Sequence, residues 1–480
     1  MSESREPAAR RAHPTVLKFG GTSVADAAAC ERVAALVRQA QRSAPPVVVV
    51  SALAGATDAL LAAADAAAGG DPGGAAASLD ALFDRHAEIA RRLTPTEAAA
   101  ALLADAARAR GELAELLEAV ARAPERRPAL QDEIASYGER LSAALLTAVL
   151  VRAGVPARCV DARRCVVTDD THGRATPLVA ATEARARAEL VPLLESGFVP
   201  VLGGYIAATI AGVTTTLGRG GSDYTAALLG AALEAREIEI WTDVSGVLTA
   251  DPRLVRHART IPSLSYAEAA ELAYFGAKVL HPNTIQPALE RGIPVRIRNS
   301  HAPADPGTQV TAHGEVRPGA VKAIAHKTGV TVLQISSARM LGAYGFLRAL
   351  FAVFERHQTV VDVVTTSEVS VSLTVDDPRA LPDIIAELRG LGTVAVEPAR
   401  AIVCVVGEGL RTTPGIAARV FATVSDINVS LISQGASRVN VTFVVDEAQV
   451  ADVVRRLHEA LFERDPAGRR VALPAKEGAR

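Results

Sequence analysis

Cysteine is scarce in this sequence, and neither charge nor hydrophobicity is concentrated in the way that a nucleic-acid or membrane partner requires. The formal net charge is −2 over 480 residues, which gives no indication of nucleic-acid binding. No apolar run of membrane-spanning length is evident. The cysteines, whose spacing matches no zinc site, are expected to be buried or incidental thiols in a reducing cytoplasm. They are Cys30, Cys159, Cys165 and Cys404.

The N-terminal residues lack the apolar core of a secretory signal. Residues 1–14 are polar and carry arginines, which predicts a disordered lead. Apolar residues make up 49% of the chain, enough to build large cores, and the length is too great for a single core. We therefore expect several domains.

The stretch Val-Leu-Lys-Phe-Gly-Gly-Thr-Ser-Val at residues 16–24 places an apolar strand directly before a glycine loop. Gly20 and Gly21 let the backbone approach an anion closely, because they carry no Cβ. N–H groups at the start of the next helix favour negative charge, and Lys18 adds a full positive charge. The pattern is typical of a phosphate site, but an ordinary strand–turn–helix with a surface lysine shares it.

Two further loops follow buried strands. The β-branched run 47–50 predicts a strand buried on both faces, and the small-residue loop 51–58 follows it. A second glycine loop at 218–223 opens an apolar helix and carries Arg219, which can fork onto a carboxylate. Ligands of open α/β sheets bind at the carboxyl ends of the strands, so these loops predict a shared binding site.

Strands alternate with helices over about 300 residues, which predicts a mostly parallel sheet covered on both faces. Residues 58–153 are expected to be helical, with a new helix starting at the capping box Thr94–Glu97. Gly138 lies inside a helix, where glycine costs stability, so it marks either a close approach or helix packing.

An internal repeat follows residues 300–325, a segment rich in Pro, Gly and His that we interpret as a linker. Gly345–Phe351 aligns with Gly415–Phe421, and Val369–Asp376 with Val439–Asp446, both at an offset of 70 residues. Each copy predicts the strand–helix–strand–strand–helix order of a ferredoxin-like α+β unit.

Four segments together resemble the signature stretches of the aspartate kinases, which belong to the amino acid kinase family. In the family's order they are Lys18–Ser23, Thr216–Asp223, Trp241–Val244 and Phe275–Pro282. The repeat resembles the tandem ACT domains of these enzymes. The helix-rich insert and the stretch Phe346–Val371 are most similar to the monofunctional, lysine-sensitive bacterial type.

The resemblance implies an amino acid kinase fold, in which helices sandwich a mostly parallel sheet, followed by two ferredoxin-like ACT units. The expected parts are the disordered lead 1–14, the catalytic domain 15–299, the linker 300–325, ACT domains at 326–398 and 399–465, and the tail 466–480.

The implied reaction transfers the γ-phosphoryl group of ATP to the β-carboxylate of L-aspartate, the first step of lysine, threonine and methionine synthesis. Two anions must meet, so positive charge and N–H donors should dominate the site, and no covalent nucleophile is required. Mg²⁺ would be held mainly by the ATP oxygens, so no protein metal ligand is expected.

The resemblance also implies individual roles. Lys18 would stabilise the transferring phosphoryl group, and Asp223 would organise the polar groups around it. Arg219 would bind the α-carboxylate of aspartate and Glu139 its amino group. The remaining pocket residues would be Ser51, Thr57 and Ser222. The phosphate-binding residues would be Gly20, Gly21, Thr22 and Ser23. The ATP-binding residues would be Thr242, Asp243, Leu248, Arg253, Lys278 and Val279.

For regulation, the resemblance implies that lysine binds between the first ACT units of two subunits, which requires at least a homodimer. Asp362 and Glu368 would bind ammonium groups, and Gly345 would leave room for the carboxylate; plain ACT core and dimer packing is the alternative. The matching residues are Met340, Gly342, Gly345, Phe346, Leu347, Val361, Asp362, Thr366, Ser367 and Glu368.

Two positions depart from the family pattern and leave details open. Leu248 replaces the usual Tyr near the nucleotide, and Ala343 replaces the usual Ser near the effector. Three alternatives to the implied function remain. They are an amino acid kinase with another substrate (glutamate, acetylglutamate, UMP or carbamate), a bifunctional kinase–homoserine dehydrogenase, and a catalytically inactive amino-acid sensor. The absence of a strand-linked Gly-x-Gly-x-x-Gly after the repeat argues against the second.

Overall fold

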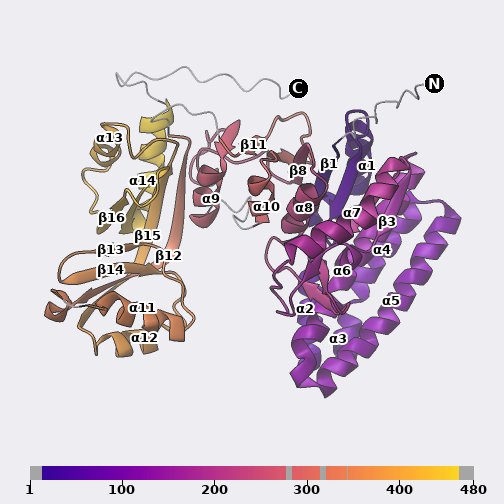
Figure 1. Ribbon diagram of the computed structural model, residues 1–480, viewed down its shortest axis with the longest axis horizontal. Helices are drawn as coiled ribbons and strands as arrows, with labels where there is room; N and C mark the ends of the chain where they lie inside the picture. Colours follow the sequence, from indigo (N-terminus) through magenta and orange to yellow (C-terminus); the bar gives the residue numbers. More distant parts are fainter. Residues whose placement is uncertain (1–12, 277–283, 314–320, 343, 464–480) are drawn as a thin grey trace, which may run out of the picture. The chain divides into compact units, whose positions relative to one another are not determined.

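The computed structural model describes residues 13–276, 284–313, 321–342 and 344–463 (Figure 1). These residues form two compact units. The first unit contains the chain up to Val247 together with 279–312, and the second contains 248–278 together with the chain from His313 onward.

The first unit is built on a mostly parallel sheet, as the alternation of strands and helices predicts. Its strand order is β3-β5-β2-β1-β8-β10-β11, and only the β10–β11 pair is antiparallel. The central strands β1 and β2 are buried along their whole length, which explains their unbroken apolar runs. The strands are β1 (Thr15–Phe19), β2 (Pro46–Val50), β3 (Ala157–Val160), β5 (Val199–Gly203), β8 (Glu237–Thr242), β10 (Val295–Asn299) and β11 (Thr308–Thr311).

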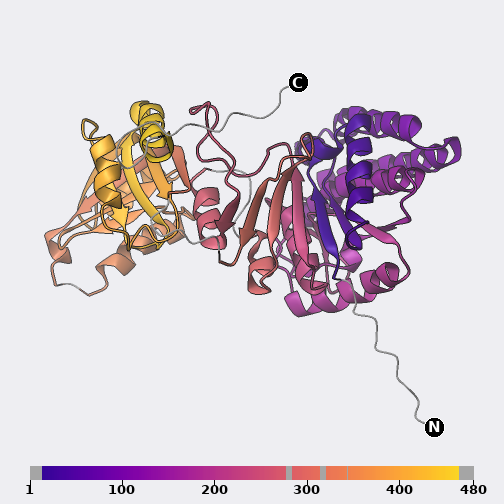
Figure 2. The same cartoon turned by 90° about the horizontal axis from the view of Figure 1, so that it is seen from above.

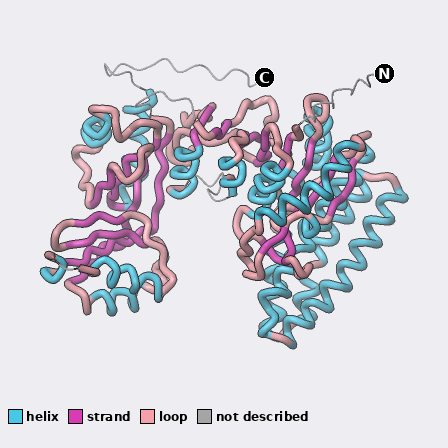
Figure 3. Tube along the Cα trace, in the orientation of Figure 1, coloured by secondary structure: helices cyan, strands magenta, loops and turns pink. Residues whose placement is uncertain are grey.

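Helices cover both faces of this sheet (Figure 2). A helix-rich insert between β2 and β3 accounts for most of them (Figure 3). Its helices contribute residues to one hydrophobic core, which they share with β1, β2 and α1. The insert consists of α2 (Ala56–Ala68), α3 (Pro72–Ser78), α4 (Asp80–Leu93), α5 (Thr96–Arg122) and α6 (Arg127–Arg152). The other helices of this unit are α1 (Ala27–Ala40), α7 (Val179–Glu195), α8 (Gly221–Ala232) and α10 (Gln286–Glu290).

The predicted capping box before α5 is wrong, although the helix begins where it was expected. The N-cap residue is Pro95, and no side chain caps the helix. The Thr94 hydroxyl instead donates to the carbonyl of Ala90 in the preceding helix, at 2.7 Å. The hydroxyl therefore caps the end of α4 instead of the start of α5, because only a short turn separates the two helices.

One described helix is long and apolar enough to cross a membrane, although it contains no unbroken apolar run of that length. Helix α6 meets that criterion by length and composition, but 67% of its apolar window is buried inside the unit. The core helix of a globular domain has the same composition, so the criterion alone is weak evidence for a membrane span.

A small three-stranded sheet brings further residues toward the carboxyl end of the main sheet. It contains β4 (Val167–Thr168), β6 (Ile206–Thr209) and β7 (Thr214–Thr216), in the order β4-β6-β7. The glycine loop 218–221 directly follows β7, so this sheet supports the loop that leads into α8.

The second unit contains a six-stranded antiparallel sheet, in the order β13-β14-β12-β15-β17-β16. Its strands are β12 (Ala323–Ser336), β13 (Val364–Thr366), β14 (Ser370–Val375), β15 (Thr393–Val406), β16 (Leu431–Gln434) and β17 (Asn440–Asp446). Its helices are α11 (Phe346–Arg356), α12 (Leu381–Leu388), α13 (Ile416–Thr423) and α14 (Val450–His458). It also contains β9 (Ser263–Ser265) and α9 (Tyr266–Tyr274).

The two repeats share their long strands. Residues 330–336 of β12 pair with the first half of β15, whereas residues 323–327 pair with its second half, which belongs to the second repeat. Each repeat therefore has its own core, one around α11 and α12 and one around α13 and α14. The segment interpreted as a linker is partly strand, because β11 and the start of β12 lie within 300–325.

Candidate active site

A pocket of about 280 Å³ lies in the first unit where the predicted loops meet. Six of the side chains that line it are residues that the sequence predicts to be catalytic or substrate-binding: Lys18, Ser51, Thr57, Glu139, Ser222 and Asp223. They come from β1, the loop after β2, α2, α6 and α8, so the fold collects residues more than 200 positions apart in one cavity.

A buried ion pair lies at the pocket wall. The ammonium of Lys18 on β1 is 2.7 Å from Oδ1 of Asp223 in the first turn of α8, and both side chains are largely buried. The pair compensates each charge for the water it loses on burial. The Lys18 ammonium is thereby held at a fixed place near the end of its strand.

The two glycines of the first glycine loop are both constrained by neighbouring parts of the fold. The Gly20 amide donates to the carbonyl of Trp241 at 3.1 Å, so it is already used by the fold. A Cβ on Gly21 would lie 2.8 Å from the carbonyl oxygen of Ala52, so only glycine fits there. Gly21 and the exposed Thr22 therefore stay candidates for phosphate contacts, whereas the Gly20 amide does not.

Ser23 is also removed from the predicted phosphate contacts. Its side chain is 1% exposed, and its hydroxyl lies 2.9 Å from the hydroxyl of Ser300. Its amide donates to the carbonyl of Gly20. Both polar groups of Ser23 therefore close the loop rather than face a ligand.

Glu139 presents a buried carboxylate to the pocket. Its Oε1 accepts a hydrogen bond from the Ala52 amide at 3.3 Å, whereas Oε2 is buried and has no partner within the described residues. Burial raises the pKa of Glu139 to about 8, and the bond from Ala52 opposes this rise only in part. A cationic ligand group would supply the missing partner.

The neighbouring glycine, Gly138, marks a close approach. A Cβ at this position would lie 2.8 Å from the Cβ of Ala52, so α6 packs directly against the loop after β2. The same Cβ would lie 3.3 Å from Cδ1 of Leu60 on α2, so Gly138 marks both a close approach to this loop and the packing of two helices.

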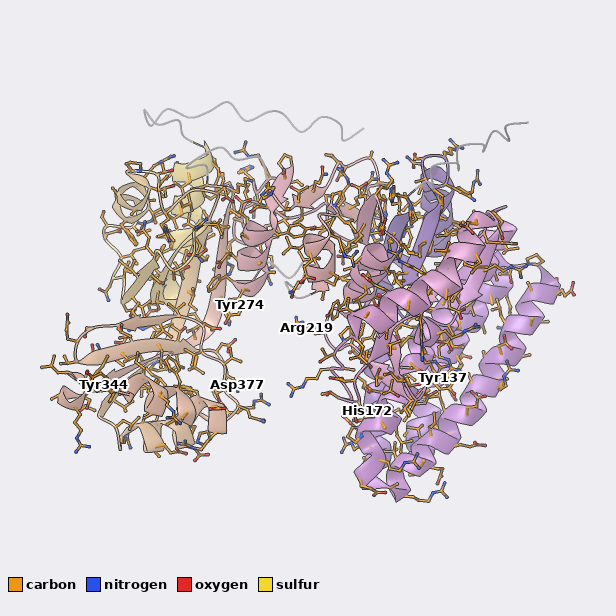
Figure 4. All side chains as sticks on the ribbon, in the orientation of Figure 1. Tyr137, His172, Arg219, Tyr274, Tyr344 and Asp377 are labelled. Atoms are coloured by element: carbon orange, nitrogen blue, oxygen red, sulfur yellow. The ribbon has the colours of Figure 1, made fainter. Side chains whose placement is uncertain are left out.

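The hydroxyl residues and the arginine differ in how firmly they are placed. Ser51 donates to the Ser222 hydroxyl at 3.0 Å, which ties the loop after β2 to α8. Thr57 lines the pocket from the start of α2. Arg219 is exposed, between two glycines that line the pocket, and no partner for its guanidinium is found in the described part of the chain (Figure 4).

Sequence reasoning missed two residues at this site. Tyr205 lines the pocket with a positive φ of 65°, a conformation that is rare for a side chain of its size. Arg85 on α4 donates to the carbonyl of Ala54 at 2.9 Å and so braces the loop after β2. The Gly203–Gly204 pair before Tyr205 is the one sequence feature that could have indicated its role. No local sequence feature predicts the role of Arg85.

A family model described as the amino acid kinase family matches residues 14–299, which is more than half of the chain. This chain belongs to the amino acid kinase family. A second model, described as an ACT domain, matches residues 403–461. The predicted fold class is therefore confirmed for both parts of this amino acid kinase.

The relatives of this amino acid kinase are aspartokinases. It is 42% identical over 344 residues to the lysine-sensitive aspartokinase 3 of Escherichia coli, covering 70% of this chain and 76% of the relative. It is similar to the crystal structure of E. coli aspartokinase III with aspartate and ADP, at 40% identity and a TM-score of 0.80, covering 94% of this chain and 100% of that one. For the same enzyme with lysine and aspartate, the TM-score is 0.78, with 94% and 99% covered. The resemblance to aspartate kinases is thereby confirmed.

The predicted ATP-binding residues of this amino acid kinase are divided between the two units. Thr242 ends β8, and its hydroxyl donates to the carboxylate of the exposed Asp243 at 3.2 Å. Leu248 and Arg253 belong to the second unit, where the Arg253 guanidinium is paired with Asp251 at 2.6 Å. Lys278 and Val279 lie outside the described residues.

The predicted effector residues of this amino acid kinase lie in the first repeat of the second unit. Met340, Phe346 and Val361 pack against its core, and Gly342 and Gly345 have positive φ values of 65° and 84°. Leu347, Thr366, Ser367 and Glu368 are exposed. Ala343, one of the two departures from the family pattern, lies outside the described residues.

Asp362 is already paired, which the sequence did not predict. Its carboxylate lies 2.8 Å from the Lys327 ammonium and accepts a hydrogen bond from the Tyr274 phenol. Lys327 also contacts Asp376 at 2.7 Å. Burial and the bond to Asp362 raise the pKa of Tyr274. An effector ammonium must therefore share or displace Lys327 to reach Asp362.

Proposed function

We propose that this chain is an aspartate kinase, which transfers the γ-phosphoryl group of ATP to the β-carboxylate of L-aspartate. The products are ADP and 4-phospho-L-aspartate. The observation that carries the proposal is one pocket in which the Lys18–Asp223 ion pair lies with a carboxylate oxygen of Glu139 that has no partner among the described residues. Such a pocket offers one charge to an anion and the opposite charge to an ammonium group.

In this proposal, aspartate binds through both groups on its α-carbon. Glu139 accepts hydrogen bonds from the ammonium group, and Arg219 forks onto the α-carboxylate. Ser51, Thr57 and Ser222 add hydroxyl contacts. The β-carboxylate then points to the Lys18 end of the pocket, because the other two groups are held elsewhere.

The chemical step needs no nucleophile from the protein. A β-carboxylate oxygen of aspartate attacks the γ-phosphorus, and the bond from that phosphorus to the ADP oxygen breaks. Lys18 reduces the repulsion between the carboxylate and the phosphoryl oxygens, and Asp223 holds the Lys18 ammonium in position. Gly21 and Thr22 are the loop residues left to contact phosphate.

The nucleotide is proposed to bind as MgATP. In the described residues, no group of three or more His, Cys, Asp or Glu side chains is placed to hold a metal ion. In this proposal the ATP oxygens hold Mg²⁺, whose positive charge would offset that of the phosphates. Thr242, Asp243, Leu248, Arg253, Lys278 and Val279 remain the proposed nucleotide contacts.

We further propose that an amino acid, with lysine as the first candidate, regulates the enzyme through a homodimer of the first repeat. Large apolar side chains are exposed on this repeat, among them Leu341, Tyr344, Phe351 and Val369. Exposed large apolar side chains of this kind are consistent with self-association. A cytoplasmic location stays a prediction.

An assay of ADP release tests the substrate proposal. MgATP is supplied with L-aspartate and, in parallel, with glutamate, acetylglutamate, UMP and carbamate. Turnover with aspartate at least a hundredfold above the others is expected. Turnover with another acceptor alone would replace the substrate, and no turnover with any acceptor would favour an inactive amino-acid sensor.

A further inference from the structure

Helix α6 carries a second buried carboxylate, Asp132, that the proposed phosphoryl transfer does not use. It is 3% exposed and lies among donors from outside its helix. The Gly173 amide donates to both oxygens at 3.1 Å, and the Thr216 hydroxyl donates to Oδ1 at 2.5 Å. Nδ1 of His172 lies 2.7 Å from Oδ2. Both oxygens of this buried carboxylate therefore have hydrogen-bonding partners from outside α6.

The partners of Asp132 support the loop that carries Arg219. Ala175 donates its amide to the carbonyl of Thr216 at 2.8 Å, so loop 171–175 is fastened to the end of β7. Gly218 follows β7 with a φ of 73°, and a Cβ there would lie 3.2 Å from the carbonyl oxygen of Gly173. The two loops are therefore in backbone contact directly before Arg219.

Asp132 and Glu139 are seven residues apart on the same helix. Seven residues make nearly two turns, so both carboxylates project from one face, about 10.5 Å apart along the axis. One end of this face presents Glu139 to the substrate pocket, and the other end holds the loop of Arg219. The helix thus connects the two groups proposed to bind the α-carbon substituents.

We propose that Asp132 is a positioning residue that sets the spacing between Arg219 and Glu139. The fixed spacing selects a ligand that carries a carboxylate and an ammonium group on one carbon. This inference rests on the proposed roles of Arg219 and Glu139 in aspartate binding.

A matched pair of variants separates this role from a contribution to folding. Thr216→Val removes one donor to Asp132 and keeps the side-chain shape, but it also removes a hydrogen bond with Tyr205, which Asp132→Asn leaves in place. Thr215→Val makes the same change one residue earlier on β7, where the hydroxyl lies 2.6 Å from that of Thr168 instead. Both threonines are fully buried. Asp132→Asn is the stronger variant, and Thr216→Val serves if that one does not fold.

The measurements are KM for aspartate, KM for ATP, the melting temperature, and inhibition constants of succinate and β-alanine. Succinate lacks the α-amino group of aspartate, and β-alanine lacks its α-carboxylate. Thr216→Val should raise KM for aspartate at least fivefold, and Asp132→Asn at least tenfold, with KM for ATP within twofold. The ratio of each inhibition constant to KM for aspartate should fall by similar factors in both variants. Thr215→Val should change neither KM for aspartate nor these ratios.

An unchanged KM for aspartate and an unchanged preference in Asp132→Asn and Thr216→Val would overturn the inference, even if their melting temperatures fall. Equal losses in Thr215→Val would overturn it as well. Failure of the proposed function is a different result, since the wild-type protein would then show no turnover with aspartate.

Discussion

Two buried ionisable residues in the pocket differ in whether the protein supplies a partner. Lys18 is paired with Asp223, whereas one oxygen of Glu139 has no partner within the described residues. A buried charge without a partner is costly, so burial raises the pKa of Glu139 to about 8. The Lys18 pair is complete without a ligand, whereas we propose that a ligand ammonium group supplies the missing partner of Glu139.

Replacing Lys18 tests the residue assigned to the transferring phosphoryl group. Lys18→Met should lower kcat by a factor of about 10² to 10³, the typical loss for one preorganised charge or donor. The measurement is steady-state ADP release under saturating substrates. Because Asp223 would lose its partner, the unfolding midpoint is measured in parallel. A folded variant with near wild-type kcat would contradict the role given to Lys18.

The raised pKa of Glu139 predicts a pH-dependent cost to stability. In the unfolded chain this carboxyl ionises near its ordinary pKa of 4.5, whereas the folded protein keeps the proton until about pH 8. Stability from this group is therefore full below pH 4.5 and is lost as pH rises toward 8. As pH rises through this window, the melting temperature of Glu139→Gln should rise relative to that of the wild type. A constant difference from pH 5 to 8 would contradict the assignment.

The same group predicts how substrate binding responds to pH. Because an ammonium ligand binds the ionised carboxylate, KM for aspartate in the wild type should fall as pH rises from 6 to 8. Glu139→Gln should lose this dependence and bind aspartate more weakly throughout. The comparison uses initial rates at saturating ATP, with KM for ATP followed at each pH as the reference.

At the scale of elements, α6 organises the substrate pocket. It presents Glu139, approaches the loop after β2 through Gly138, and holds the loop 171–175 through Asp132. The segments that α6 contacts come from different parts of the first unit, as expected for a helix that is largely buried. A displacement of α6 should therefore alter the site as well as the core.

A glycine-to-alanine pair tests this role of α6. Gly138→Ala would place a Cβ 2.8 Å from that of Ala52, so we expect a loss of about 1–3 kcal/mol in unfolding free energy and a higher KM for aspartate. Gly111→Ala on α5 meets no atom within 4 Å and should stabilise by about 0.5–1 kcal/mol. Chemical denaturation and kinetics check both. Similar stability changes for the two variants would contradict the close approach.

At the scale of the whole molecule, regulation is proposed to depend on the second unit. An effector inhibits only if it binds one global state more tightly than another. In the first repeat, Asp362 is held by Lys327 and Tyr274, so a bound ammonium group would rearrange these contacts. Tyr274 is the last residue of α9, and the Phe275–Pro282 signature stretch follows it directly in the sequence. We therefore expect a change at Tyr274 to affect this stretch.

Lysine should inhibit the wild-type enzyme, and Asp362→Ala should raise the concentration for half inhibition at least tenfold. Asp377→Ala is the matched control, because Asp377 is a half-exposed carboxylate of the same repeat whose ion-pair partner, Arg379, lies two residues away (Figure 4). Rates are followed over a lysine titration. Flat wild-type activity would refute lysine as effector, and threonine is then titrated.

Self-association is predicted to depend on the exposed apolar residues of the first repeat. Tyr344→Asp should shift the protein toward monomer, since Tyr344 is fully exposed in the single chain. Val151→Asp, at an exposed apolar residue of α6, should leave the oligomeric state unchanged. Sedimentation velocity over a concentration series measures both. A wild-type protein that stays monomeric would refute the dimer.

The sequence by itself determined the local features. Strand and helix periodicity, the glycine loops and the repeat were sufficient for the fold class, for most of the residues that line the pocket and for the family. These features are local because a strand, a loop or a helix start needs only neighbouring residues. The domain boundaries stay predictions.

Only the tertiary structure decided which polar groups are already hydrogen-bonded or paired within the protein. The Gly20 amide and Ser23 are bonded to Trp241 and Ser300, and Asp362 is bonded to Lys327, each across a long stretch of sequence. It also placed Tyr205 in the pocket and interleaved the two repeats on β12 and β15. A donor or acceptor is committed by whichever group the fold brings within about 3 Å, and sequence spacing does not fix that distance.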